Sequence, residues 1–411
     1  MNQIIKKTDP QIAALIEKEN RRQQETLSLI ASENYPSKAV RAALSSIFVA
    51  KYAEGRPYKR YYGGQENIDK LETLVEERAK KVFKLDSKKW VVNVQPLSGA
   101  PANYEILRGL LDIGNRILCL HLPHGGHLSQ GAKASLTGQD FKPIYYYLNK
   151  NGFLDYKEIE KLAKKTKPKL IICGYTAYPR KVDFKKFSQI AKKVGAYLLT
   201  DTSHITGLII GGVHPSPFPW ADVVMTTTHK TLRGPRGAMI ICRKKLEKKI
   251  FPKVFPGLQG GPHEHTICAI GVALKEAMSQ KFKKYTQQIV KNSQTLASEL
   301  KKYNFNLVSE GTDNHLVLVD LRNKNITGKP AQELLEKAGI VTNRNTIPYD
   351  PLTPYDPSGI RLGTPALTTR GMKAKEVKKI AFWVNEVISN PKSIPKIKQE
   401  VKKLCQKFPI P

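Results

Sequence analysis

Three short segments of the 411-residue chain place reactive side chains directly after apolar runs that are typical of β-strands. The segment LLTDTSHITG brings Asp201 and His204 to the end of one run, and VVMTTTHK brings Lys230 to the end of another. In NVQPLSGAPAN, a third run turns through Ser98 and Gly99 into the expected start of a helix. Ligands of open α/β sheets bind beyond the carboxyl ends of the strands, so we expect these groups to line one site.

These residue types together could hold and activate pyridoxal phosphate. A lysine with an apolar strand behind it can form a Schiff base with an aldehyde. An aspartate one strand away can pair with a pyridinium nitrogen. The backbone N–H groups of a helix N-terminus can bind a phosphate. Each feature alone also has an ordinary explanation as a surface lysine, a helix cap or a turn, so it is their combination that indicates the cofactor.

The elements that must position these residues follow an alternating pattern between about residues 70 and 245. Helical periodicity over Tyr156–Lys165 and Phe184–Val194 separates some of the strand-like runs, which are WVVNV, NRILCL, KLIICG, AYLLTD, DVVMTT and GAMIICR. Short apolar strands that alternate with helices predict a mostly parallel sheet covered on both faces.

The pattern changes after Gly261. One long helix is expected from about Thr266 to Tyr303, followed by the strand HLVLVDL, a helix near PAQELLEKAG and a helix over KEVKKIAFWVNEVIS. Between the last two helices, NTIPYDPLTPYDPSGIRLGTPA reads as a long loop, and loops of that length are usually functional. We therefore predict a helical arm over 1–20, a large α/β domain over 21–275 and a smaller α+β domain over 276–411.

Composition narrows the class of protein. No uninterrupted apolar run reaches 18 residues, and the segment MNQIIKKTDPQIAALIEKENRRQQE lacks the apolar core of a secretory signal. The five cysteines are scattered without a C-x-x-C pair, which predicts a reducing, cytoplasmic location and no zinc site. The net charge of +33 indicates lysine-rich solvated helix faces, while a basic stripe on one face would instead favour nucleic-acid binding.

The chain resembles the serine hydroxymethyltransferases, a family of fold-type I pyridoxal-phosphate enzymes. TTTHKTLRG together with RYYGG is the most specific part of the resemblance. The matching segments run in order along nearly the whole chain: LSLIASENYPSKAV, KYAEGRPYKRYYGG, QPLSGAPAN, LPHGGHLSQG, TDTSHITGLI, TTTHKTLRGPRG, FPGLQGGP and SGIRLGTPALTTRG.

The resemblance implies a large domain with a mostly parallel seven-stranded sheet between helices, joined to a smaller C-terminal α+β domain. It also implies the reversible conversion of serine and tetrahydrofolate to glycine and 5,10-methylenetetrahydrofolate, with no metal. By this resemblance the chain is a homodimer with shared active sites, although a tetramer remains open, and neither a membrane nor a nucleic acid is expected as a partner.

For the cofactor, the resemblance assigns the Schiff base to Lys230, the bond to the pyridine nitrogen to Asp201 and stacking on the ring to His127. Thr176 and His204 match positions near the ring hydroxyl. The remaining matched positions lie near the phosphate or come from the neighbouring subunit, and they are Ser98, Gly99, Tyr52, Gly260 and Gly261.

For the substrates, the resemblance implies that Arg361 binds the amino-acid carboxylate and that Ser32 lies near it. Glu54 matches the acid–base carboxylate near the serine hydroxyl and the folate, and Tyr62 matches an active-site tyrosine. Tyr52, Glu54 and Tyr62 would come from the partner subunit. The positions that match folate contacts are Leu122, Gly126, Leu128 and Asn345.

The sequence departs from the family pattern at Ala100, Gln130, Pro179, Ser203 and Tyr349. None of these changes removes a chemical group that the reaction requires, but Ser203, Pro179 and Tyr349 bear on substrate and folate affinity. A related pyridoxal-phosphate enzyme such as a threonine aldolase therefore remains an alternative, and dependence on folate would distinguish the two.

Overall fold

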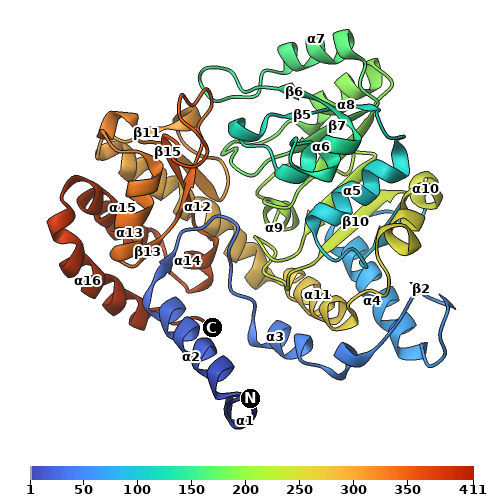
Figure 1. Cartoon of the computed structure of the whole chain (residues 1–411), viewed down its shortest axis with the longest axis horizontal. Helices are drawn as coiled ribbons and strands as arrows, with labels where there is room; N and C mark the ends of the chain where they lie inside the picture. Colours follow the sequence, from blue (N-terminus) through green and yellow to red (C-terminus); the bar gives the residue numbers. More distant parts are fainter. Residues whose placement is uncertain (1) are drawn as a thin grey trace.

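A seven-stranded sheet forms the larger part of the computed structural model, which describes residues 2–411 (Figure 1). Its order is β4-β10-β9-β8-β7-β5-β6, and only β10 runs antiparallel to its neighbours. The strands are β4 Trp90–Asn93, β5 Arg116–Leu120, β6 Lys142–Tyr146, β7 Leu170–Gly174, β8 Tyr197–Asp201, β9 Val223–Thr227 and β10 Ala238–Arg243. The predicted mostly parallel α/β sheet is confirmed.

Helices cover both faces of this sheet because its strands are apolar on both sides. Leu199 packs in the same cluster as Ile106 of helix α5, whereas Leu198 packs with Phe187 of helix α8 on the opposite face. The helices around this sheet are α4 Glu66–Val82, α5 Gly99–Leu110, α6 Leu136–Asp140, α7 Tyr156–Thr166, α8 Phe184–Lys193, α9 Thr206–Ile210, α10 Glu247–Pro252 and α11 Glu264–Ala277.

A second, four-stranded antiparallel sheet has the order β11-β12-β15-β14 and lies beside the first in Figure 1. Its strands are β11 Asn306–Leu307, β12 Leu316–Asp320, β14 Asn343–Asn345 and β15 Gly359–Gly363. The helices that belong to this half are α12 Gln280–Lys302, α13 Gly328–Lys337, α14 Pro365–Thr369, α15 Ala374–Ser389 and α16 Ile394–Lys407.

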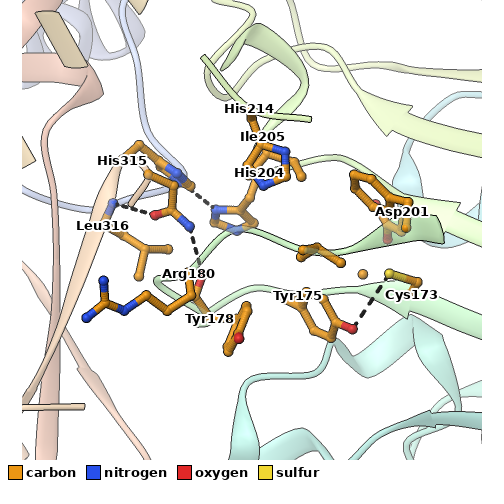
Figure 2. Close-up of a pocket in the computed structure, with 14 residues that line it drawn as sticks. Cys173, Tyr175, Tyr178, Arg180, Asp201, His204, Ile205, His214, His315 and Leu316 are labelled. Carbon is orange, nitrogen blue, oxygen red and sulfur yellow. Dashed lines mark hydrogen bonds between the residues drawn. The ribbon is translucent and has the colours of Figure 1, made fainter. Parts of the chain in front are cut away.

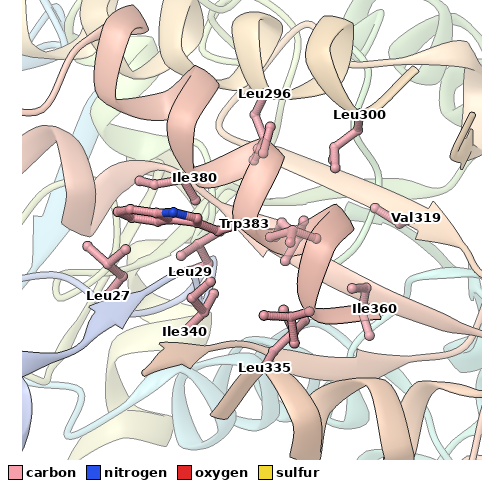
Figure 3. Packing of buried hydrophobic residues seen from close by; sticks show 14 of the residues in the cluster. Leu27, Leu29, Leu296, Leu300, Val319, Leu335, Ile340, Ile360, Ile380 and Trp383 are labelled. Carbon is pink, nitrogen blue, oxygen red and sulfur yellow. The ribbon is translucent and has the colours of Figure 1, made fainter. Parts of the chain in front are cut away.

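The N-terminal segment joins this second core. Its helices are α1 Asn2–Thr8, α2 Pro10–Glu25 and α3 Lys38–Leu44, and the short strand β1 Leu27–Ser28 pairs in parallel with β13 Ile340–Val341. Figure 3 shows Leu27 and Leu29 among the buried side chains around Trp383. The hairpin of β2 Gly55–Arg56 and β3 Lys59–Arg60 follows. The domain boundaries given above stay predictions.

Two expectations from the sequence were wrong in detail. The single long helix expected up to Tyr303 is two helices, because Ser279 has extended backbone geometry and its hydroxyl accepts a hydrogen bond from the N–H of Phe282, which caps α12. The expected proline-rich loop contains β15, whose five residues are all buried. The glycines at both ends of GIRLG and the central arginine hide the strand pattern.

No helix among residues 2–411 is both long and apolar enough to cross a membrane. The cysteines of the chain are all free in the structure.

Candidate active site

The carboxyl ends of three neighbouring strands of the large sheet meet where the sequence places reactive residues. Gly174 at the end of β7 pairs with Asp201 at the end of β8, and Asp201 pairs with Met225 of β9. The chain then continues through Thr227 toward Lys230. The parallel register therefore brings Asp201 and Lys230 to the same edge of the sheet, as the sequence predicts.

Four donors hold the carboxylate of Asp201. Oδ2 accepts hydrogen bonds from the amides of Gln130 at 2.8 Å and Asn103 at 3.2 Å. Oδ1 accepts from the N–H of Ser203 at 3.1 Å and from its hydroxyl at 2.6 Å. These bonds come from two loops and a helix, so the carboxylate has a fixed orientation at the sheet edge.

Lys230 is partly buried and is influenced by other charged groups. Its Nζ donates to the hydroxyl of Thr227 at 2.9 Å, and its carbonyl accepts from the amide of Asn34 at 2.9 Å. Burial lowers the pKa of Lys230 to about 8, while the charge of Asp201 raises it and that of Arg361 lowers it. A substantial fraction of this amine is therefore neutral near pH 8, the form that attacks carbonyl groups.

The N-terminus of α5 lies against the strand that leads to the lysine. Ser98 has extended backbone geometry at the N-cap, and its side chain makes no capping bond. A Cβ atom added to Gly99 would lie 2.7 Å from Cγ2 of Thr227, so only glycine allows this approach. The side-chain amide of Gln259 bonds the backbone at both Leu97 and Gln95, which fixes it beside this turn. The arrangement suits an anion such as a phosphate.

Arg361 is a buried cation without an acidic partner. The residue is 9% exposed, and it donates to the carbonyl of Thr176 at 2.6 Å and to Oδ1 of Asn343 at 3.2 Å. Burial lowers the pKa of Arg361 to about 10, and no carboxylate within residues 2–411 offsets that effect. A buried guanidinium without an anion is costly, which favours an anionic ligand at this place.

Ser32 lies in a loop that contacts the strand of Arg361. The N–H of Gly363 donates to the carbonyl of Leu29, and a Cβ on Gly363 would lie 2.3 Å from Cα of Ala31. The close packing of these two backbones places the loop beside β15. Asn34 of the same loop bonds the carbonyl of Lys230, so the loop spans both ends of the site.

His127, Thr176 and His204 are held by short hydrogen bonds. Nδ1 of His127 lies 2.8 Å from the hydroxyl of Ser129, and burial lowers the pKa of His127. The hydroxyl of Thr176 donates to the carbonyl of Gly126 at 2.6 Å. Nδ1 of His204 lies 3.0 Å from Nε2 of His315. Lys230 and Arg361 both influence the pKa values of His127 and His204, so these residues share one charged environment.

A second group of predicted residues gathers elsewhere in the chain. The hydroxyl of Tyr62 donates to Oε2 of Glu54 at 3.4 Å, and the ring of Tyr62 lies edge-on to that of Tyr52. A Cβ on Gly260 would lie 3.3 Å from Oε1 of Glu54, and one on Gly261 would lie 3.5 Å from the ring of Tyr52. Hydrogen bonds between residues 2–411 do not join this group to Lys230, Asp201 or Arg361.

The four positions matched to folate contacts lie on connected loops. The hydroxyl of Thr346, next to Asn345, donates to the carbonyl of Pro123 at 2.9 Å, and the N–H of Thr176 donates to the carbonyl of Gly125. These bonds bring the segment around Asn345 to the loop that carries the other three positions, Leu122, Gly126 and Leu128. Both leucine side chains are exposed.

The departures from the family pattern have clear contacts. The hydroxyl of Ser203 bonds Asp201 and also accepts from the N–H of Thr227 at 3.1 Å. The carbonyl of Pro179 accepts from the hydroxyl of Thr312, and the hydroxyl of Tyr349 donates to the carbonyl of Leu148. Ser203 therefore helps to hold Asp201, whereas the bonds of Pro179 and Tyr349 join neighbouring segments of the chain.

Sequence reasoning missed several residues of the site. Asn34 was passed over because it stands in a short polar loop, and Gln130 was noted only as a departure. Asn103 could have been found, since Ile106 and Leu107 follow it at helical spacing and predict that this amide lies on the buried face of the helix, as it does. His315 stands at the start of an apolar strand, where a histidine is usually interpreted as a hydrogen-bonded core residue.

Within residues 2–411 there is no group of three or more side chains suited to a metal ion.

Comparison with known proteins agrees with this geometry. The family model described as serine hydroxymethyltransferase matches residues 5–384. A serine hydroxymethyltransferase from Desulfotalea psychrophila is 52% identical over 410 residues, which cover 99% of this chain and 96% of the relative. The charged residues at the sheet edge thus belong to a chain that matches one family over almost its full length, and the chain is a member of the serine hydroxymethyltransferase family.

Proposed function

We propose that the residues at the edge of the large sheet carry out the family's reaction, the reversible interconversion of serine and tetrahydrofolate with glycine and 5,10-methylenetetrahydrofolate. The family depends on pyridoxal phosphate and uses tetrahydrofolate as co-substrate. The observation that carries the assignment is the presence, in one charged environment, of a partly buried lysine of lowered pKa and a buried arginine that lacks an acid. The lysine suits an aldehyde cofactor, and the arginine suits an amino-acid carboxylate.

The residues present fit pyridoxal phosphate. Lys230 would hold the aldehyde carbon, and Asp201 would keep a proton on the pyridine nitrogen. The free side chain of Ser98 and the first N–H groups of α5 would hold the phosphate, since Gly99 leaves no side chain in the way. When bound, the cofactor supplies an electron-accepting ring that stabilises the carbanion left when the Cα–Cβ bond of serine breaks.

The chain's own groups then orient the substrate. Arg361 would bind the serine carboxylate with two parallel hydrogen bonds, since a planar guanidinium matches a carboxylate in geometry. Ser32 would lie near the same carboxylate. His127 would cover one face of the ring, and Thr176 and His204 would face its hydroxyl oxygen.

Glu54 would exchange protons with the serine hydroxyl or the folate. We propose that it does so in the site of a partner subunit, together with Tyr52 and Tyr62. The contacts of these residues with Gly260 and Gly261, rather than with Lys230, support this assignment. An exposed apolar stretch surrounds them, and such patches mark protein interfaces; it comprises Ile47, Val49, Tyr52, Tyr58, Tyr61 and Tyr62.

The folate would bind against the exposed leucines, Leu122 and Leu128, with Gly126 and Asn345 at the same loops.

We also propose a cytoplasmic location, which the five free cysteines support, since disulfides are rare in reducing compartments. The positive charge is assigned to solvated helix faces, because exposed lysines recur on helices that pack against different sheets, such as α8 and α12.

The test measures serine cleavage by the purified holoenzyme with and without tetrahydrofolate, and then traps the cofactor with borohydride for peptide mapping. We expect folate-dependent formation of glycine and a label on Lys230. Rapid cleavage of threonine or serine that ignores folate would instead indicate an aldolase, and a label on another lysine would overturn the residue assignment.

A further inference from the structure

A narrow buried pocket lies behind the site, between the large sheet and the small sheet. Figure 2 shows it with Asp201 and His204 on one side and His315 and Leu316 on the other. His204 follows the end of β8, whereas His315 immediately precedes β12 of the small sheet. The pocket is therefore a seam where the two halves of the chain place polar side chains against each other.

The central contact of this seam joins two histidines. Nδ1 of His204 lies 3.0 Å from Nε2 of His315, and the two residues are 5% and 0% exposed. Neutral imidazole carries one proton, so in such a contact one ring donates and the other accepts. The direction of this hydrogen bond therefore determines which nitrogen of His204 carries its proton.

Both rings are neutral at physiological pH. Burial lowers the pKa of His315 to about 3, with the charges of Arg361 and Lys230 acting in the same direction. Burial also lowers the pKa of His204 well below its usual value, and Lys230 and Arg361 lower it further. Each ring accordingly has one N–H group and one unprotonated nitrogen.

The surroundings of His315 decide the direction. Its Nδ1 is buried and has no hydrogen-bond partner within residues 2–411. If His204 donated, the proton of His315 would sit on that Nδ1 as an unpaired buried N–H, which is rarer in proteins than an unpaired acceptor. Nε2 of His214 belongs to the same pocket and could accept such a proton, but it has no hydrogen-bond partner either, so the two nitrogens do not bond each other. The favoured arrangement has Nε2–H of His315 donating to Nδ1 of His204.

We infer that His315 is a positioning residue that fixes the tautomer of His204, so that His204 presents Nε2–H as a hydrogen-bond donor. That nitrogen has no partner among the described residues, and unlike Nδ1 of His315 it is not fully enclosed by protein. The inference rests on the proposed function, in which His204 faces the hydroxyl oxygen of the cofactor ring. An N–H at this place would donate to that oxygen, whereas the other tautomer would present a lone pair.

The backbone around His315 is fixed to the large sheet in a way that suits this role. The amide of Asn314 donates to the carbonyl of Tyr178 at 3.0 Å, and the N–H of Asp313 donates to the carbonyl of Pro179 at 2.8 Å. The hydroxyl of Thr312 donates to that same carbonyl at 3.1 Å. Three consecutive residues thus anchor the segment before His315, so the imidazole reaches His204 in a defined orientation.

The direct test reads the tautomer by nitrogen-15 NMR of the holoenzyme labelled at histidine, with the His204 signals identified by their loss in His204→Gln. We expect protonated Nε2 and unprotonated Nδ1 for His204. Protonated Nδ1 in the wild-type protein would overturn the inference, whatever the variants do. This readout does not depend on turnover, so absence of folate-dependent serine cleavage would overturn the proposed function separately.

Variants separate positioning from packing. His315→Leu keeps a side chain of similar size but removes the donor, so His204 should change to the other tautomer or a mixture. We expect kcat to fall about 10-fold, the lower end of the loss seen when the orienting partner of a metal-bound histidine is removed. His315→Gln can still donate from its amide and should restore the wild-type tautomer and most of the kcat. The control Thr166→Val removes a hydroxyl hydrogen bond within helix α7, outside the seam, and it should leave the tautomer unchanged. An unchanged tautomer in His315→Leu would contradict the inference.

Discussion

Lys230 is partly buried and Arg361 is buried, and the surroundings of the two cations differ in a way that separates their roles. Burial lowers the pKa of Lys230 to about 8, so the amine can lose its proton near that pH, and the charge of Asp201 offsets only part of this effect. Arg361 has no such acid, and its bonds go to a carbonyl and an amide oxygen. The lysine is therefore suited to exchange protons and form bonds, whereas the arginine remains a fixed positive charge for a ligand.

Replacement of Arg361 by lysine should weaken serine binding. Lysine keeps the charge but loses the paired donors, so we expect a loss of about 1.5–3 kcal/mol, the usual contribution of a hydrogen bond to a charged group. Titration of the bound-cofactor absorbance with serine measures this change. Arg322→Lys is the matched control, since Arg322 pairs with Asp320 beyond the neighbouring strand. Equal serine affinity in Arg361→Lys and wild type would mean that the carboxylate binds elsewhere.

The lowered pKa of Lys230 predicts how the apoenzyme recombines with pyridoxal phosphate. Only the neutral amine attacks the aldehyde, so the rate should rise with pH and level off above about 8, the pKa that burial gives this lysine. An ordinary lysine would show a rate that still increases toward its usual pKa of about 10.4. Stopped-flow absorbance across this pH range distinguishes the two curves, and a midpoint near 10 would contradict the buried environment.

Individual residues of the site were predictable where their type is chemically unusual at a strand end. Lys230 and Asp201 met that condition, whereas Arg361 lies in the middle of a strand and followed from the resemblance. The structure brings all three into one charged environment. Asn34 and His315 did not, because their roles depend on bonds to residues 196 and 111 positions away in the chain. Such contacts follow from the tertiary fold rather than from local pattern.

At the scale of elements, the site depends on how closely the start of α5 approaches the end of β9. Gly99 allows this contact because it lacks a side chain. The same close approach recurs where Gly363 of β15 packs on Ala31, which brings the loop of Ser32 to the small sheet. One contact joins a helix start to a strand end and the other joins a loop to a strand end, and both need a glycine at the point of closest approach.

Gly99→Ala should therefore weaken cofactor binding. The added methyl group would lie 2.7 Å from Cγ2 of Thr227, well inside the normal carbon–carbon distance, and would push the helix start away from β9. We expect a cost of about 1–3 kcal/mol in pyridoxal-phosphate affinity, the usual range for overpacking. Equilibrium dialysis measures this affinity. Ser279→Ala is the control, because it removes the cap of α12 and should lower the melting temperature without changing cofactor affinity. Unchanged affinity in Gly99→Ala would show that the helix start is not the phosphate site.

The sequence predicted the elements of the large sheet better than those of the small one. Fully buried strands such as β7 and β8 are continuous apolar runs, and these are easy to recognise. Strand β6 at the sheet edge was not recognised because KPIYY begins with lysine and proline. Strand β15 was not recognised because its central arginine belongs to the site. Strand pattern therefore fails where an edge position or a function replaces apolar residues.

At the scale of the whole molecule, the predicted site residues separate into two groups. Lys230, Asp201 and Arg361 gather at the sheet edge, whereas Glu54 and Tyr62 gather beside Gly260 on an exposed apolar stretch. Among residues 2–411, no hydrogen bond joins the second group directly to Lys230, Asp201 or Arg361. In a symmetric dimer, each copy can complete the site of the other, and the stretch would be buried between them.

The most direct test of this account mixes two inactive variants, Lys230→Ala and Glu54→Gln, after reversible dissociation of the oligomer. Random reassociation makes half of the dimers mixed, and each mixed dimer has one site with both residues intact, so folate-dependent serine cleavage should return to roughly a quarter of the wild-type rate. Each variant alone should stay inactive through the same dissociation and reassociation. Absence of recovered activity, with mixed dimers shown to be present by mass spectrometry, would contradict the account, because Glu54 would then act in the site of its own chain.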